Sequence, residues 1–301
     1  MLDAYRQMQR EAVEELEKRY RNLHETEERP ENAWKVVNVD GEERYVRSAI
    51  PFVGKEYFSN PNGYRVLLYA SAENLSGYAD GIEELSEEYR VHRCRQSFEA
   101  SVAAGEFFPS VHIQPINDGG LLVVAYQILK RIMGEAFETI YGNMQPAEFL
   151  EHICCSNYGK FTLHVGDGKT NYDYASDKNV LKYCHEYIKA DIDVLKPDII
   201  IMPKSMYEGA DQKQELLDPL YPDILVFPVY QINARVVNCV IHRNLNKNKD
   251  LPPNYKYAEV DTDLLTKNER LWHENIKKIK QDNFKSIYAY VEDVVSNKTR
   301  R

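Results

Sequence analysis

The feature that most constrains the fold is an unbroken apolar run at residues 66–70, Val-Leu-Leu-Tyr-Ala. The run is too short for a helix and shows no alternation of apolar and polar residues, so it predicts a strand covered on both faces, as in a parallel sheet. Ser71 and Ala72 follow it, and then Glu73 and Asn74. Because ligands of open α/β sheets bind beyond the carboxyl ends of the strands, we expect a site at Glu73 and Asn74.

A later helix and strand also indicate an α/β fold. Apolar residues recur at helical spacing over residues 177–195, and Pro197 ends the predicted helix. Residues 198–202 follow directly and predict a buried strand. A helix that leads straight into a buried strand is typical of βαβ units. Two more apolar stretches, 223–227 and 236–241, predict further strands.

Segments on either side of these strands predict extensions of the domain. Apolar residues at three- and four-residue steps predict an amphipathic helix over residues 2–23, ending before Pro30. Residues 32–54 predict a short hairpin around Asp40-Gly41. The expected organisation is an N-terminal helix and hairpin extension (1–50), an α/β domain (51–245), and a basic loop with a C-terminal helical extension packed on it (246–301).

Composition narrows the functional class. The 301 residues contain no apolar run near the roughly 18 residues of a membrane span, so we expect a soluble, cytoplasmic protein. Five cysteines without a C-x-x-C spacing indicate reduced thiols and no metal or iron–sulfur site. A net charge of −9 opposes binding to a phosphate backbone, but from His242 onward Lys and Arg outnumber Asp and Glu.

The order of several short motifs resembles the uracil-DNA glycosylase superfamily over roughly residues 50–245. The motifs are Ala72-Glu73-Asn74 after the first strand, Ser156-Asn157-Tyr158-Gly159-Lys160-Phe161, the segment 192–201 and, in part, Ile241-His242-Arg243-Asn244. The resemblance implies a three-layer α/β/α fold with a central, mainly parallel four-stranded sheet. It also implies a divergent DNA glycosylase-like hydrolase that cleaves the N-glycosidic bond of uracil or a related damaged base in DNA repair by base excision.

The resemblance assigns chemical roles to particular residues. Glycosidic cleavage builds positive charge on the sugar and negative charge on the leaving base. Glu73 suits the first charge and His242 the second, while Glu73 or Asn74 holds the attacking water. The Asn157 carboxamide, with a donor side and an acceptor side, can pair with the edge of an extruded pyrimidine.

Aromatic and basic residues complete the expected site. The ring that stacks on the base is Tyr78, Tyr158 or Phe161, and the sequence does not choose among them. The residues expected to contact phosphates are Lys160, Arg243 and Lys247. The expected partner is single- or double-stranded DNA or a free nucleobase, with no cofactor and no membrane.

Some of these residues have simpler structural explanations. Glu73 and Asn74 fit a solvated turn equally well, Asn157 fits a left-handed residue at a helix end, and His242 fits a capped or partly buried histidine. A metal cluster is a further alternative, although helical spacing favours the core for its members: His152, Cys154, Cys155, Cys184 and His185.

Departures from the family pattern leave the function open. Ser71 replaces the opening Gly of the first motif, and the third motif lacks its Pro-Ser. The alternative is therefore a catalytically inactive nucleobase- or nucleic-acid-binding module, or an interaction scaffold, on the same fold. The terminal helices offer surfaces for a homodimer.

Overall fold

The computed structural model describes residues 2–37, 43–45, 47–59, 64–72, 125, 128–141, 149, 151–163, 177–229 and 295–296. The chain divides into two compact units. Unit 1 comprises Met1–Ser97 and Ala147–Gln231, and unit 2 comprises Phe98–Pro146 and Ile232–Arg301. The expected division at residues 50 and 245 stays a prediction.

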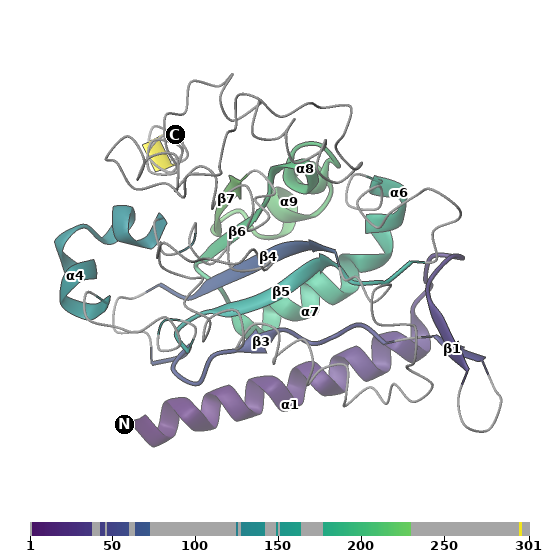
Figure 1. The fold of residues 1–301 in the computed structure, drawn as a ribbon, viewed down its shortest axis with the longest axis horizontal. Helices are drawn as coiled ribbons and strands as arrows, with labels where there is room; N and C mark the ends of the chain where they lie inside the picture. Colours follow the sequence, from purple (N-terminus) through teal and green to yellow (C-terminus); the bar gives the residue numbers. More distant parts are fainter. Residues whose placement is uncertain are drawn as a thin grey trace, which may run out of the picture. The chain divides into compact units, whose positions relative to one another are not determined.

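Unit 1 is built on a five-stranded mixed sheet in the order β3-β5-β4-β6-β7 (Figure 1). The strands are β3 (Phe52–Val53), β4 (Val66–Ala72), β5 (Cys154–Gly159), β6 (Ile199–Pro203) and β7 (Leu225–Val229). Strands β5, β4, β6 and β7 are parallel to one another, and β3 pairs antiparallel with β5. The sheet is mainly parallel, as predicted, but the predicted count of four strands is wrong. The two-residue antiparallel strand β3 is too short to leave a pattern in the sequence.

The central strand β4 is buried on both faces, as its unbroken apolar run predicts. Leu67 and Tyr69 lie on one face, in register with Cys154 and Ser156 of β5. Leu68 lies on the other face, and its side chain is also buried. The α/β class inferred from this run is confirmed.

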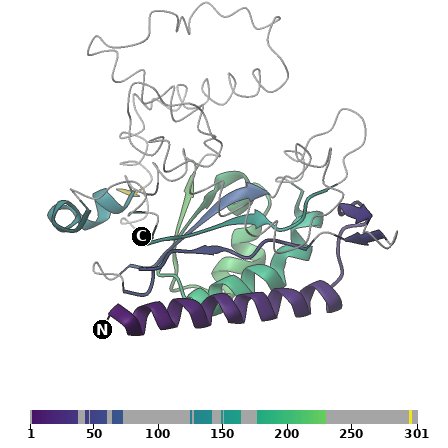
Figure 2. The same ribbon diagram turned by 60° about the horizontal axis from the view of Figure 1, so that its bottom comes forward.

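Helices α7 (His185–Leu195) and α1 (Leu2–Thr26) lie on one side of the sheet and pack against each other (Figures 1 and 2). Both contribute to one apolar cluster with the strands, in which Tyr20 of α1 meets Tyr187 of α7 edge-on. The N-terminal helix predicted from apolar spacing is confirmed, and its apolar face packs within unit 1.

The helical segment that ends with α7 begins and ends where the sequence predicts. It consists of α6 (Lys178–Leu181), the 3₁₀ turn η2 (Lys182–Cys184) and α7. Asp177 caps α6, since its carboxylate accepts a hydrogen bond from the Asn179 N–H. The helix ends at Lys196, whose φ is 48°, immediately before Pro197.

The remaining elements are short. Between β6 and β7 lie α8 (Lys204–Tyr207), the π-helical turn η3 (Lys213–Leu217) and α9 (Asp218–Leu220). The predicted hairpin is present as antiparallel β1 (Lys35–Val37) and β2 (Glu43–Tyr45). Unit 2 contains α4 (Glu135–Tyr141). The predicted strand 236–241 and nearly all of the helix predicted at 264–295 lie outside the described residues.

Candidate functional site

Strands β4 and β5 end side by side at the edge where a ligand is expected. Ala70 lies opposite Asn157, and Ala72 lies opposite Gly159. Because parallel strands have their carboxyl ends at the same edge, the strand that carries Asn157 ends beside the strand that leads into the first predicted motif. Of the first motif only Ala72 is among the described residues, so the expectation that the two motifs belong to one site stays a prediction.

Asn157 is the candidate ligand-binding residue that the structure describes at this edge. Side chains alternate along a strand, so Asn157 lies on the opposite face from Ser156 and Tyr158. It is half-buried, whereas both neighbours are buried. Within the described part of the chain, its carboxamide makes no hydrogen bond. The alternative of a left-handed residue at a helix end is wrong, because Asn157 is in a strand.

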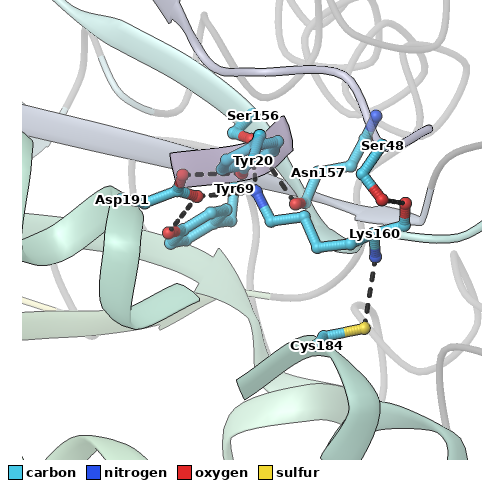
Figure 3. A network of polar contacts seen from close by, with 8 residues as sticks. All are labelled: Tyr20, Ser48, Tyr69, Ser156, Asn157, Lys160, Cys184 and Asp191. Atoms are coloured by element: carbon cyan, nitrogen blue, oxygen red, sulfur yellow. Dashed lines mark hydrogen bonds and ion pairs between the residues drawn. The ribbon is translucent and has the colours of Figure 1, made fainter. Parts of the chain in front are cut away.

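On the other face of β5, Lys160 is held by a buried group of polar side chains, which we call the core network (Figure 3). The Lys160 Nζ atom lies 2.6 Å from Asp191 Oδ2 and donates to Ser156 Oγ at 2.8 Å. Lys160 and Asp191 are 1 % and 0 % exposed. The core network consists of Tyr20, Tyr69, Ser156, Lys160 and Asp191.

Two tyrosines complete the hydrogen bonding of Asp191. Tyr20 of α1 donates to Oδ1 at 2.7 Å, and Tyr69 of β4 donates to Oδ2 at 2.9 Å. Burial, reinforced by the neighbouring Asp191 carboxylate, raises the pKa of both phenols well above the ordinary value. The Lys160 ammonium also lies 5.4 Å and 5.3 Å from the centres of the two rings. The charges of Lys160 and Asp191 are therefore surrounded by hydrogen-bond donors and aromatic rings and withdrawn from solvent.

The geometry of the core network opposes the predicted contact of Lys160 with a phosphate. Its backbone is also fixed, since the N–H donates to Cys184 Sγ at 3.3 Å and the carbonyl accepts from Ser48 Oγ. A phosphate contact would require the ammonium to leave the core network. The structure thus gives Lys160 a packing role that the sequence analysis did not foresee.

Tyr158 belongs to a second buried group of hydrogen bonds. Its hydroxyl donates to Gln212 Oε1 at 3.0 Å, and the same oxygen lies 2.9 Å from His185 Nε2. The carboxamide nitrogen of Gln212 donates to the Ala210 carbonyl at 3.1 Å. Burial raises the Tyr158 pKa well above its ordinary value. The ring is fully buried, so stacking on a base would require it to leave this packing.

Phe161 also lies in the core. Its ring is 4 % exposed and meets Tyr187 of α7 edge-on, with ring centres 5.6 Å apart. Of the three aromatic residues expected to stack on a base, the structure therefore describes two, both packed inside unit 1. The third, Tyr78, lies outside the described residues.

Several other candidates also fall outside the described part of the chain. They are Glu73, Asn74, His242, Arg243 and Lys247. Their assigned roles stay predictions.

Cysteine and histidine form no metal-binding group in the part that is described. No set of three or more His, Cys, Asp and Glu side chains there is arranged to hold an ion. Cys154, Cys155 and Cys184 are buried thiols, and burial raises the Cys154 pKa well above its ordinary value. None of the described helices has the length and apolar character needed to cross a membrane.

The sequence contained one signal for the core network that pattern reading missed. Asp191 occupies a position on the apolar face of α7, three residues after Ile188 and four before Leu195. A carboxylate there must be paired when it is buried, and Lys160 is the one cation of the motif at 156–161. Tyr20 and Tyr69 carried no such signal, because buried tyrosines are common core residues.

Comparison of the chain with family models, curated proteins and solved structures finds no match.

Proposed function

We propose that the chain binds a nucleobase at the carboxyl edge of β4 and β5 and hydrolyses the N-glycosidic bond of uracil or a related damaged base in DNA. In this proposal the chain is a divergent DNA glycosylase-like hydrolase with a three-layer α/β/α fold. The observation that carries it is the Asn157 carboxamide, which has no partner in the described residues and lies opposite Ala70, close to the end of β4.

The surroundings of Asn157 support a role in binding rather than in packing. A half-buried carboxamide without a partner contributes little to folding, since its hydrogen-bonding groups gain nothing over water. The same carboxamide offers a donor and an acceptor to a ligand, which is the pattern that a pyrimidine edge requires. Its neighbours Ser156 and Tyr158, in contrast, are buried and bonded within the protein.

The remaining roles follow from the chemistry of glycosidic cleavage. Glu73 stabilises the positive charge that develops on the sugar and, with Asn74, holds the attacking water. His242 donates to the leaving base, and Arg243 and Lys247 contact the DNA backbone. Each of these assignments is part of the proposal.

The test is release of free base from single- and double-stranded oligonucleotides that contain uracil or another damaged base. We expect release by the wild type and a loss of at least about 100-fold in the Glu73→Ala variant, because a residue that positions and activates water contributes this much. Glu208→Ala is a matched control, since that carboxylate lies on the surface of unit 1 in an exposed pair with Lys204. Absence of release from every lesion tested removes the enzymatic proposal.

A second candidate is a binding module without chemistry, and the third motif, which lacks its Pro-Ser, favours it. This candidate predicts binding of the same oligonucleotides without base release. A titration at two salt concentrations separates it from a protein-interaction scaffold, because contact with phosphates makes affinity fall as salt rises.

A further inference from the structure

The side chains next to Asn157 are anchored on the core side of β5. Lys160 Nζ donates to Ser156 Oγ, so one hydrogen bond joins the residues on either side of the segment Asn157-Tyr158-Gly159. Tyr158, inside this segment, is bonded to Gln212. Asn157, whose carboxamide has no partner among the described residues, thus lies in a stretch of backbone that is fixed before, within and after it.

Asp191 connects this anchoring to two other elements. It accepts hydrogen bonds from Tyr20 of α1, Tyr69 of β4 and Lys160 (Figure 3). The helix α1 is therefore linked through Tyr20 and Asp191 to the end of β5, although Tyr20 and Asp191 are 171 residues apart in the chain.

We propose that Lys160, Asp191 and Tyr20 are positioning residues that hold the end of β5 so that the Asn157 carboxamide is presented to a base. This inference rests on the proposed function of Asn157. It makes the first helix of the chain a determinant of ligand affinity, although Tyr20 is buried on the face of the sheet opposite Asn157.

The physical reason lies in the difference between stability and geometry. A buried ion pair loses hydration, and an apolar replacement of similar volume is often equally stable. Its hydrogen bonds, however, have preferred distances and directions that apolar contacts lack. The hydrogen bond from Lys160 to Ser156 bridges the segment 157–159, and the ion pair with Asp191 holds Lys160 in place, so together they fix the direction of the Asn157 side chain more closely than packing does.

The experiment uses a variant that removes the polarity and keeps the volume: Tyr20→Phe, Tyr69→Phe, Lys160→Met and Asp191→Leu together. Three quantities are measured in the full-length chain. They are the free energy of unfolding in urea, the affinity for a fluorescent uracil-containing oligonucleotide, and hydrogen exchange of the backbone amides at residues 156–159.

A positioning role predicts an unfolding free energy near that of the wild type, with an affinity lower by at least about tenfold. It also predicts at least about tenfold faster exchange at residues 157–159. If the variant is stable and its affinity and exchange equal those of the wild type, the core network is structural only and the inference is overturned.

Failure of the proposed function and failure of the positioning role give different results. If the wild type does not bind the oligonucleotide, the proposed function fails, and the exchange rates at residues 157–159 still decide whether the network positions this segment. If the quadruple variant does not fold, the single variant Tyr20→Phe replaces it. That variant should bind several-fold more weakly and exchange faster at the end of β5, and wild-type behaviour in both measurements contradicts the inference.

Discussion

The two faces of β5 use their polar residues in opposite ways. On the core face, Ser156 and Tyr158 are buried, and both side chains are bonded to other residues of the protein. On the other face, Asn157 is half-buried and its carboxamide has no partner in the described residues. Paired polar groups in a core fix structure, whereas an unpaired group at a sheet edge is available to a ligand. The contrast separates residues that stabilise the fold from a residue that we propose to bind a ligand.

The largest effect is expected from breaking the core network at Asp191. Asp191→Ala leaves the Lys160 ammonium buried without its counter-ion, and it removes the acceptor of two tyrosine hydroxyls. We expect a loss of about 3–5 kcal/mol in the free energy of unfolding, measured in urea.

Asp193 on the same helix is the matched control for this variant. Its carboxylate is half exposed, 3.8 Å from Arg19, and accepts from the Tyr221 hydroxyl. Asp193→Ala should cost only about 0–1 kcal/mol, because exposed ion pairs contribute little. Equal losses for the two variants contradict the distinction between buried and exposed carboxylates.

A second effect concerns pH. The folded protein holds the phenol protons of Tyr20 and Tyr69 more tightly than the unfolded chain does, since their pKa values are raised in the fold. This contribution to stability is complete below the ordinary tyrosine pKa of 10.0 and decreases as pH rises above it.

Urea midpoints across the alkaline range measure this dependence. The double variant Tyr20→Phe/Tyr69→Phe should lose less stability than the wild type between about pH 8 and about pH 11. Identical slopes for the two proteins show that ionisation of these phenols does not contribute to alkaline unfolding.

A smaller effect is expected at Tyr158. Tyr158→Phe keeps the ring in the core but removes the hydroxyl that donates to Gln212 Oε1. Because His185 Nε2 remains within 2.9 Å of the same oxygen, the acceptor stays satisfied, and we expect a loss of about 1 kcal/mol in urea unfolding. A loss as large as that of Asp191→Ala would mean that the two buried networks act as one unit.

The smallest effect on stability is expected on the other face of the strand. Asn157→Ala removes a side chain with no bond in the described residues, so the unfolding free energy should change by no more than about 0.5 kcal/mol. A loss above about 2 kcal/mol would assign Asn157 to the structure of the sheet and remove the contrast between the two faces.

The sequence predicted the elements that have a regular pattern of apolar residues. It missed an element whose polar side chains are bonded inside the core. The apolar runs of β4 and β6 and the spacing in α1 and α7 predicted four elements correctly. Strand β5 was not recognised, because Ser156 and Asn157 suggest a loop until Lys160 is known to bond Ser156 from the core.

The candidate site shows the same limit. Motif order selected Asn157, which lies in β5 opposite Ala70 of β4, and its role in binding a base stays a prediction. The same reading assigned Lys160 to a phosphate, because a local pattern does not reveal a carboxylate 31 residues further along the chain. Charges whose partners lie on other elements are therefore the least predictable part of such a site.

The most direct test is a titration of the isotope-labelled protein with uracil, followed through the side-chain amide resonances of Asn157 in a nitrogen–proton spectrum. Asn157→Ala identifies these resonances by their loss, and the exposed Asn179 serves as the control side chain. A base-binding role of Asn157 predicts saturable shifts at Asn157 without shifts at Asn179. Unchanged Asn157 resonances at saturating uracil, with the protein folded, would contradict a base-binding role at the end of β5.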